Sequence, residues 1–539
     1  MTTRAPTSAA ARPGETAGPS RPATTGGYAW YALGLLALIN LLNYLDRNVI
    51  FALFDPIKHD LGLSDAQLGW LGSAYILVFS VAALPFGVLS DLRSRRTVIA
   101  GGVAFWSAFT FLGGFVRNFW QLFVCRASVG IGEAAYGPAA SSLVADFFPG
   151  RGRAMAMGLL NSGIALGGVL GILLGGLIEH HWGWRAAFMV VGLPGFLCAI
   201  LAAELKDPAR PPGEPLHLRD LGLGLRGLAR HLWPLALALV IGAVAAWVIT
   251  VRRGADSRLD AAVFAAATAV GLALTVLRWV RLFRARAAPA PAGAAADGAP
   301  LDAIEPAEAA FGEELESAFD ELMRAGRTVL RTPTLVFVFA AGALISFGMN
   351  GLVGWGPTFI SRELGLSAAA ASTLLGKWGL IAGTTGTVFG GIFADWLRRR
   401  WETGRVVTVA AGFLVGGPLA LWCLTIRDLA LFVPVFAAAF FFLSWYNGPI
   451  GAAIFDVVPA RISATVMGAY LLFIHVAGDA IAFPLVGALS DRFGLDRAIL
   501  LLPAVSILGG VVILGALRTL GRDMARCALR AAAGAESGA

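Results

Sequence analysis

Apolar runs, each long enough to cross a bilayer, recur along this chain in two sets of six. A spanning helix needs roughly 20 predominantly apolar residues, and so many runs of that length are typical of membrane proteins. The first set lies near 29–54, 66–90, 97–116, 120–147, 154–178 and 186–204, and the second near 334–360, 368–394, 405–426, 429–455, 464–489 and 497–517. The pattern predicts an all-α membrane protein.

Composition supports this class and argues against others. Of the 539 residues, 57% are hydrophobic and 14% are charged, which is too little charge to cover a soluble protein of this size. The net charge of +8 could suggest nucleic-acid binding, but the arginines lie in short clusters between apolar runs. The four cysteines are far apart, and the chain has no HExxH and no GxxxxGK[ST] motif. We therefore expect no nucleic-acid partner, no metal, no other cofactor and no ATP hydrolysis.

Basic loops predict the orientation in the membrane. They follow the second, fourth, sixth and eighth runs, so alternating helices place all of them on one side. Lysine and arginine are enriched in cytoplasmic loops, and we expect a bacterial-type inner (plasma) membrane protein with both termini cytoplasmic. Residues 1–27 lack the apolar core of a signal peptide, and we expect them, like 521–539, to be cytoplasmic tails, the first one disordered.

The two sets of runs are copies of one another. Three short motifs occur in both sets, in the same order and at nearly constant offset, which is hard to obtain by chance. They pair IKHDLGLS at 57–64 with ISRELGLS at 360–367, Gly87-x-x-x-Asp91 with Gly391-x-x-x-Asp395, and DxxPxRxxAxxMG at 146–158 with its copy at 456–468. A duplicated six-helix unit is the architecture of a transporter whose pseudo-symmetric halves rock around a central site.

An insert over 208–330 separates the two six-helix bundles, which we place at 28–207 and 331–520. It holds two further apolar runs, near 232–250 and 261–282, so the expected architecture is 12 + 2 segments. These two runs could span the membrane as a peripheral hairpin, which would place the arginines between them outside against the usual bias, or they could lie partly in the interface. The acidic end of the insert is predicted to form a cytoplasmic amphipathic helix outside the translocation path.

Charged residues inside two apolar runs are the main candidates for a functional site. A charge in the membrane core costs several kcal/mol unless it is paired or wet. The first run carries Asn43, Asp46 and Arg47, and the fourth carries Arg126 and Glu133 at helical spacing over a stripe of small residues. That stripe lets the first helix come close enough to pair. We interpret the group as a substrate- or proton-binding cluster, with a permanent structural ion-pair network as the alternative.

The second set of runs offers a smaller group. Asn350 holds the position equivalent to Arg47, and Lys377 lies in the eighth run. His475 and Asp479 lie one turn apart in the eleventh run. These side chains could bind a polar substrate group or a proton, or His475 and Asp479 could merely satisfy Lys377 and backbone groups.

The loops at one end of the runs carry a candidate gate. Gly87 would let helices approach closely, and Asp91 could meet a helix N-terminus or an arginine of the other half. We expect Asp91→Asn to populate a state open to the cytoplasm. The full set of gating candidates is Gly87, Asp91, Arg95, Arg96, Asp146, Arg151, Asp395, Asp456 and Arg461.

The amino-acid sequences of these segments resemble those of a known family. GVLSDLRSRR at 87–96 resembles the GxLaDRxGRR signature of the major facilitator superfamily. NYLDRNVI, LGWLGSAYILVFS, RASVGIGEAAYGPAA, WGPTFI and HVAGDAIAFP more specifically resemble the Spinster (Spns) family, although Phe483 stands where many relatives have serine. The resemblance implies the major-facilitator fold and export of sphingosine-1-phosphate or lysophospholipids. It also implies that Asp46, Arg47 and Glu133 form a proton-responsive or substrate-facing cluster.

Together these features predict a secondary active transporter that works by alternating access. We expect a monomer, linked to protons, that carries an amphiphilic anion such as a lysolipid, with Arg47 at the anionic head. A proton-coupled organic-acid or sugar-acid symporter is the alternative, and a non-transporting membrane sensor is the rival class. Gly478-Asp479 lacks the partner motif of an intramembrane aspartyl protease, so we expect no enzyme.

Overall fold

A computed structural model describes residues 26–92, 94–148, 152–207 and 305–536. Within these ranges all regular structure is helical. The predicted hairpin at 232–250 and 261–282 lies outside the described residues, as does Arg151.

The first set of runs forms five long helices and one short one. They are α1 (Gly26–Ala52), α2 (Phe54–Leu61), α3 (Asp65–Leu92), α4 (Arg95–Leu112), α5 (Phe119–Phe147) and α6 (Arg153–Ala203). The 51 residues of α6 contain two crossings, because the chain breaks at Gly183, where φ is 81°. Glycine takes such a left-handed conformation without steric cost, so the fifth and sixth predicted runs meet there in a tight turn.

The second set is more segmented. It comprises α10 (Pro333–Leu364), α11 (Ala368–Arg398), α12 (Gly404–Cys423), α13 (Leu429–Leu443), α14 (Pro449–Val457), α15 (Ala460–Ile474), α16 (Ala480–Phe493), α17 (Leu495–Ala498) and α18 (Leu501–Ile513), followed by α19 (Leu520–Glu536). A short π-helical segment, His475–Asp479, joins α15 to α16 into one crossing. Such segments frequently occur at functional sites.

Ten helical stretches in the described part of the chain are long and apolar enough to span a membrane. One of the ten is α6, which contributes two crossings, and α5 adds a 29-residue helix that carries two charges. Each of the twelve predicted runs therefore corresponds to a helical crossing, and the predicted fold class is confirmed.

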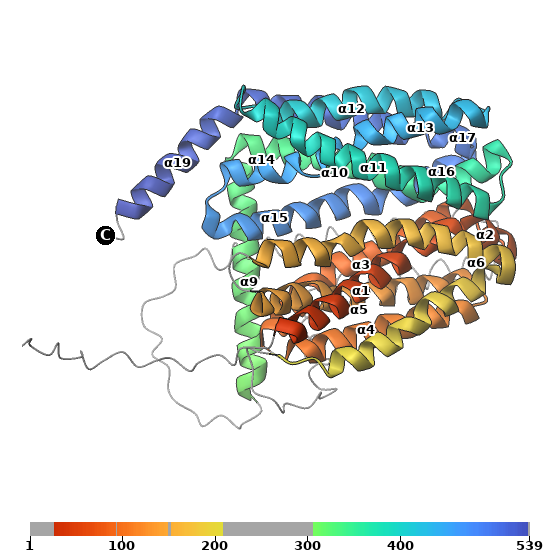
Figure 1. The fold of residues 1–539 in the computed structure, drawn as a ribbon, viewed down its shortest axis with the longest axis horizontal. Helices are drawn as coiled ribbons and strands as arrows, with labels where there is room; N and C mark the ends of the chain where they lie inside the picture. The colour runs from red at the N-terminus through yellow and green to blue at the C-terminus, as the bar shows by residue number, and fades with distance from the viewer. Residues whose placement is uncertain (1–25, 93, 149–151, 208–304, 537–539) are drawn as a thin grey trace, which may run out of the picture.

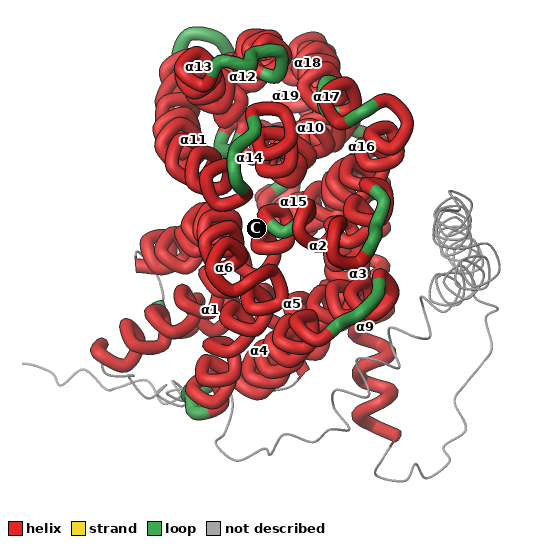
Figure 2. Tube along the Cα trace, turned by 90° about the vertical axis from the view of Figure 1, so that its right-hand side faces the viewer, coloured by secondary structure: helices red, strands yellow, loops and turns green. Residues whose placement is uncertain are grey.

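The helices form two groups that face each other (Figures 1 and 2). In the first group α1 packs against α6, and α5 packs against α3 and α4; in the second, α10 and α12 pack against α18. The two groups meet mainly where α3 packs against α16 and α6 against α11. The interface between the groups is therefore built from a few helices of each half, as expected for halves that rock.

The acidic end of the insert is helical, as predicted. It forms α9 (Glu305–Arg331), which runs across both groups in Figure 1. Ala318 packs against the apolar core of the first half, whereas Ala325 and Val329 are buried in the core of the second. We use the names α9 end and α2 end for the two ends of the molecule.

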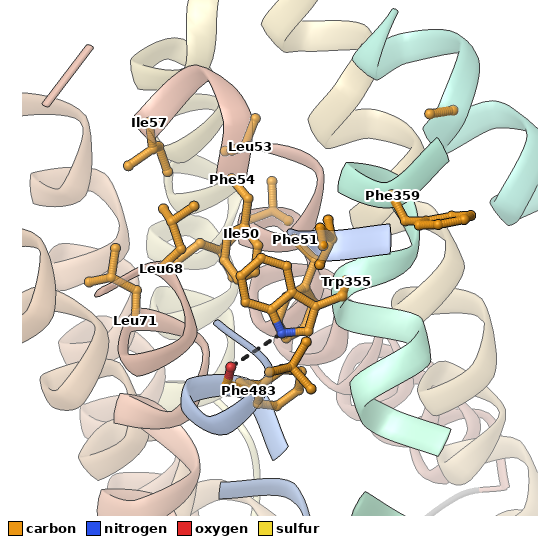
Figure 3. Packing of buried hydrophobic residues seen from close by; sticks show 14 of the residues in the cluster. Ile50, Phe51, Leu53, Phe54, Ile57, Leu68, Leu71, Trp355, Phe359 and Phe483 are labelled. Carbon is orange, nitrogen blue, oxygen red and sulfur yellow. Dashed lines mark hydrogen bonds between the residues drawn. The ribbon is translucent and has the colours of Figure 1, made fainter. Parts of the chain in front are cut away.

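At the α2 end an apolar layer closes the space between the halves (Figure 3). Phe51 of α1 stacks on Phe483 of α16 with ring centroids 5.0 Å apart, and Phe54 lies 5.1 Å from Trp355 of α10. The Trp355 indole also donates to the Phe483 carbonyl at 3.3 Å. A side chain at Gly72 would begin 3.2 Å from the Phe51 ring, so glycine makes room for the aromatic layer. Phe483 is thus a central part of this seal.

Candidate functional site

The four charged residues of α1 and α5 form two crossed ion pairs inside the first half. Asp46, Arg126 and Glu133 are at most 2% exposed, and Arg47 is 8% exposed. The helices α1 and α5 therefore do come close enough to pair their charges, as predicted. Each pair, however, has distinct surroundings.

The first pair, Asp46 with Arg126, is fully satisfied on the carboxylate side. Arg126 Nη1 lies 3.0 Å from Asp46 Oδ1, and the Thr110 hydroxyl donates to Oδ2. Arg126 also donates to the backbone carbonyls of Asp46 and Arg47, each at 3.3 Å. These contacts tie α5 and α4 to α1, which is the behaviour of a structural ion pair.

The second pair, Arg47 with Glu133, is less constrained. Arg47 Nε lies 2.5 Å from Glu133 Oε2, while Glu133 Oε1 is buried and has no hydrogen-bond partner within the described structure. The guanidinium lies over the rings of Phe79 at 4.5 Å and Tyr44 at 4.6 Å, where cation–π attraction holds it. A buried carboxylate oxygen without a donor is costly as an anion. One oxygen of the Glu133 carboxylate is therefore left without a donor within the described structure.

Sequence reasoning missed four residues of this site, of which Tyr44 lies on α1 itself, with its ring against the Arg47 guanidinium. Thr110 comes from α4, and Tyr75 and Phe79 come from α3, with Tyr75 lying 5.6 Å below both guanidinium groups. A threonine or an aromatic residue in an apolar run carries no charge, so nothing in the sequence distinguished them from residues that only pack. Asn43, a predicted site residue, is 1% exposed, and its amide nitrogen lacks a hydrogen-bond partner among the described residues.

Thr110→Val is expected to destabilise the protein by about 1.5–3 kcal/mol, because a charge-assisted hydrogen bond to Asp46 is lost without a change of shape. The matched control is Thr408→Val, since Thr408 is equally buried but donates to the Gly404 carbonyl of its own helix at 2.9 Å. Thermal unfolding in detergent should show a lower midpoint for the first variant. Equal midpoints for the two would contradict the structural role of the Asp46 pair.

In the second half, Asp479 contacts two of the other three predicted residues, Asn350 and His475, and also Ser346, which was not predicted. Its Oδ1 accepts from Asn350 Nδ2 at 2.9 Å and from the Ser346 hydroxyl, and its Oδ2 lies 2.6 Å from His475 Nδ1. The Lys377 ammonium instead lies over the Trp378 ring at 5.1 Å. No described contact joins Asp479 to Lys377, and both interpretations of the His475–Asp479 pair, a substrate- or proton-binding site or a structural contact, stay predictions.

A cavity of about 230 Å³ lies between the halves, lined by residues of α1 and α6 on one side and mainly of α10 to α13 on the other. Its wall is apolar and includes stacked rings of α13, where Phe436 lies 5.6 Å from Phe440. Asn48, next to Arg47 in the chain, lines the same cavity and donates to the Tyr44 carbonyl at 2.8 Å. The charged pair and the cavity therefore both adjoin α1, at consecutive residues, although none of the four charged residues lines the cavity.

The candidate gating residues form contacts within each half. Arg95 pairs with Asp146, and Arg96 donates to the Leu205 carbonyl at 3.4 Å. In the second half Arg405 Nη1 lies 2.5 Å from Asp456 Oδ2, and its Nη2 lies 3.8 Å from Asp395. The side chains of Asp91 and Arg461, and all of Arg151, lie outside the described residues. A gate across the halves at this end stays a prediction.

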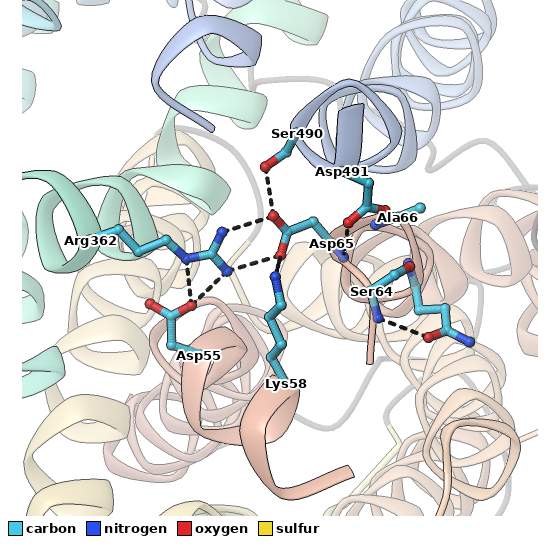
Figure 4. A network of polar contacts seen from close by, with 9 residues as sticks. Asp55, Lys58, Ser64, Asp65, Ala66, Arg362, Ser490 and Asp491 are labelled. Atoms are coloured by element: carbon cyan, nitrogen blue, oxygen red, sulfur yellow. Dashed lines mark hydrogen bonds and ion pairs between the residues drawn. The ribbon is translucent and has the colours of Figure 1, made fainter. Parts of the chain in front are cut away.

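The α2 end carries a network of charges that does cross between the halves (Figure 4). Arg362 of α10 donates to Asp55 at 2.8 Å and forms a bidentate contact to Asp65 at 2.8 and 2.9 Å. Lys58 Nζ lies 2.7 Å from Asp65 Oδ1, and the Ser490 hydroxyl donates to Asp65 Oδ2 at 2.6 Å. Sequence reasoning missed this network. Lys58 and Arg362 lie in the duplicated IKHDLGLS and ISRELGLS segments, so the repeat itself was the available signal.

Comparison with known proteins defines the class. The model of the Major Facilitator Superfamily matches residues 36–254 and 261–478, and the chain belongs to this superfamily. It is a multi-pass membrane transporter and not an enzyme.

The resemblance to Spinster proteins is also confirmed. The chain is 33% identical to "Protein spinster" of Drosophila melanogaster, over 37% of this chain and 33% of that protein. An "MFS-type efflux pump" of Mycolicibacterium smegmatis is 27% identical over 90% of this chain and 91% of its own. A "Probable galactarate/D-glucarate transporter" of Bacillus subtilis is 34% identical over 34% of this chain and 42% of its own. The chain thus spans about a third of the length of the spinster protein.

A solved structure shares the fold. A bacterial homolog of the human lysosomal transporter Spinster, in an inward-facing and unoccupied conformation, superposes with a TM-score of 0.67 at 20% identity. The match covers 93% of this chain and 99% of that one.

Proposed function

We propose that this protein is a secondary active transporter for an amphiphilic anion such as a lysolipid, working by alternating access and linked to protons. The observation that supports this most is the position of Arg47. It is a buried arginine that binds one carboxylate oxygen of Glu133, and its neighbour in the chain, Asn48, lines an apolar cavity between the halves.

Arg47 suits the anionic head. A guanidinium has five donors in a fixed plane that matches phosphate and carboxylate groups. Within the described structure one of these donors, Nε, makes a hydrogen bond, and the central carbon of the guanidinium lies over aromatic rings. An anion can therefore replace cation–π contacts with stronger charge-assisted hydrogen bonds.

The cavity suits an alkyl tail. Burying one methylene group is worth about 0.8 kcal/mol, which corresponds to a roughly fourfold gain in affinity. Relatives support both readings of the substrate, since "Sphingosine-1-phosphate transporter SPNS2" of Mus musculus is 35% identical over 32% of this chain. The sugar-acid transporter named above keeps a short hydrophilic acid as the alternative.

A series of single-chain lysophosphatidic acids is expected to bind more tightly with each added methylene, roughly fourfold per step until the cavity is full. Gly379→Leu places bulk beside Phe436 and Phe440 and should flatten this series. Val388→Phe adds bulk on an exposed position of the same helix and should leave it unchanged. Binding to nanodisc-embedded protein measures the series. A preference for glucarate over every lipid would establish the alternative, and liposomes without flux of any probe would indicate a sensor.

We also propose the plasma membrane, both termini cytoplasmic, and a monomer. The basic loops at the α9 end support this orientation through the bias of lysine and arginine toward the cytoplasm. The sealed α2 end would then face outside, and the described conformation would be closed to the outside.

A further inference from the structure

Stacked side chains form an apolar strip on α11 near the α9 end. The ring centroids of Phe389 and Phe393 are 6.1 Å apart with their planes 10° apart, and those of Phe393 and Trp396 are 5.6 Å apart. Residues three and four positions apart lie on the same face of a helix. The three rings therefore make one continuous apolar surface, which we call the α11 strip.

The α11 strip lies on the outer side of the second half. Phe389 is 47% exposed and Trp396 is 45% exposed, and the strip packs on Trp445, whose ring centroid lies 5.3 Å from those of Phe389 and Phe393. Gly379 is the last residue of α11 that lines the cavity between the halves, and it precedes the strip. Figure 2 places α11 at the edge of the second group. Because α11 is long and apolar enough to span the membrane, the exposed rings face lipid.

Two arginines follow the strip at the end of α11. The Arg400 guanidinium carbon lies over the Trp396 ring at 4.2 Å, which is the geometry of a cation–π contact. Arg399 and Arg400 are both exposed, and within the described part of the chain neither forms an ion pair. Asp395, one turn before Arg399, instead lies 3.8 Å from Arg405. The end of the strip thus carries two positive charges without a described counter-ion.

The arginines and the rings complement the two parts of an anionic phospholipid. Tryptophan and arginine near the end of a spanning helix lie at the level of the lipid head groups, and Trp401, which is 60% exposed, adds a second tryptophan there. A guanidinium binds a phosphate through charge-assisted hydrogen bonds, and basic side chains at a membrane surface attract anionic lipids. An acyl chain that descends from such a head group would lie on the stacked rings.

We propose that Arg399, Arg400 and the α11 strip form a binding site for a phospholipid with a net negative head group, such as phosphatidylglycerol. The two arginines bind the phosphate, and the strip supports one acyl chain. A zwitterionic lipid carries the same phosphate beside a fixed cation, so the arginines favour the anionic lipid. The site lies on the lipid-facing surface, apart from the transport cavity, and does not depend on which substrate is carried.

Native mass spectrometry of the full chain in detergent tests the site. The protein should bind dioleoylphosphatidylglycerol more tightly than dioleoylphosphatidylcholine. The double variant Arg399→Gln/Arg400→Gln should lose roughly 30-fold in affinity for the anionic lipid and little for the zwitterionic one, because each arginine near an anionic head group contributes about fivefold. The matched control is Arg153→Gln/Arg324→Gln, which removes two charges from exposed positions of α6 and α9 at the same end. It should leave both affinities unchanged.

Trp396→Leu tests the strip separately. Leucine keeps an apolar side chain but removes the flat ring under Arg400, so the affinity for phosphatidylglycerol should fall roughly 2- to 5-fold. Trp422→Leu is its control, because Trp422 of α12 is similarly exposed, at 50%, and has no cation–π contact within the described residues. Equal affinities of the two leucine variants would remove the strip from the site.

An Arg47→Ala background separates this site from the proposed transport site. The preference for phosphatidylglycerol should persist there, and its loss would place the lipid in the transport cavity and overturn the proposal. Wild-type affinity in Arg399→Gln/Arg400→Gln, or an equal loss in the Arg153→Gln/Arg324→Gln control, would also overturn it. Displacement of the lipid by inorganic phosphate at constant ionic strength would assign the two arginines to a soluble anion instead.

Discussion

Arg47→Ala is expected to weaken binding of a lysophosphatidic acid by roughly 30-fold to several-thousand-fold. The reason is that truncating one partner of a buried, hydrogen-bonded charge pair costs about 2–5 kcal/mol. In the free protein Arg47 is already desolvated and held over Phe79 and Tyr44, so the anion meets a preorganised donor. The other arginine of this cluster, Arg126, is committed to Asp46.

Arg47→Lys is expected to retain part of the affinity. Lysine keeps the charge but replaces a planar fork of donors with a compact ammonium group. The control is Arg427→Ala, since Arg427 pairs with Glu363 at 2.9 Å on a half-exposed surface. Binding to nanodisc-embedded protein, read by calorimetry, should rank wild type above the lysine variant and the lysine variant above alanine. Wild-type affinity in a folded Arg47→Ala variant would remove the proposed head-group site.

Glu133→Gln is expected to abolish substrate accumulation driven by a pH gradient while leaving binding and substrate exchange intact. With no substrate present, Arg47 compensates the Glu133 carboxylate. An anion that takes Arg47 leaves a buried charge unpaired, and the least costly response is to bind a proton. Proton uptake and substrate binding would then be linked through one shared arginine.

This linkage has a definite sign. If one proton enters with the anion, wild-type affinity falls up to tenfold per pH unit as pH rises through the titration of Glu133. Glutamine mimics the protonated form, so the variant should bind with an affinity that is flat in pH. Flux in liposomes with an imposed gradient, beside Glu363→Gln as a surface control, measures the coupling. A folded Glu133→Gln variant with full pH-dependent flux would leave Asp46 as the next candidate, although its carboxylate is already satisfied by Arg126 and Thr110.

The transmembrane architecture was predictable from the sequence because its determinants are local. In lipid, every backbone hydrogen bond must be satisfied inside the helix, so a run of about 20 apolar residues already specifies a crossing. The duplicated motifs likewise predicted two similar halves without any knowledge of contacts. The location of the charged cluster followed from the same rule, since Asp46, Arg47, Arg126 and Glu133 interrupt apolar runs and must find partners or water.

The partners themselves depended on the tertiary structure. Arg126 and Glu133 lie on one face of α5, and their spacing could not say that Arg126 binds Asp46 while Arg47 binds Glu133. That choice depends on the depth at which α1 crosses α5 and on Thr110 from a third helix. Local spacing therefore identified the charged groups, whereas only packing separated a satisfied ion pair from one with an open oxygen.

The closed end of the molecule was decided by tertiary structure alone. Asp65, Arg362 and Asp491 lie at helix ends, where a sequence predicts ordinary solvated charges. Their contacts join residues about 300 to 430 positions apart. They exist only while α3 and α16 are pressed together by the glycines and by the seal around Phe483. The sequence by itself determined which segments cross the membrane and which charges they bury, because helix formation in lipid is local. Which helices of the two halves touch, and at which end of the molecule, depends on how the two bundles dock. No local sequence pattern encodes that docking.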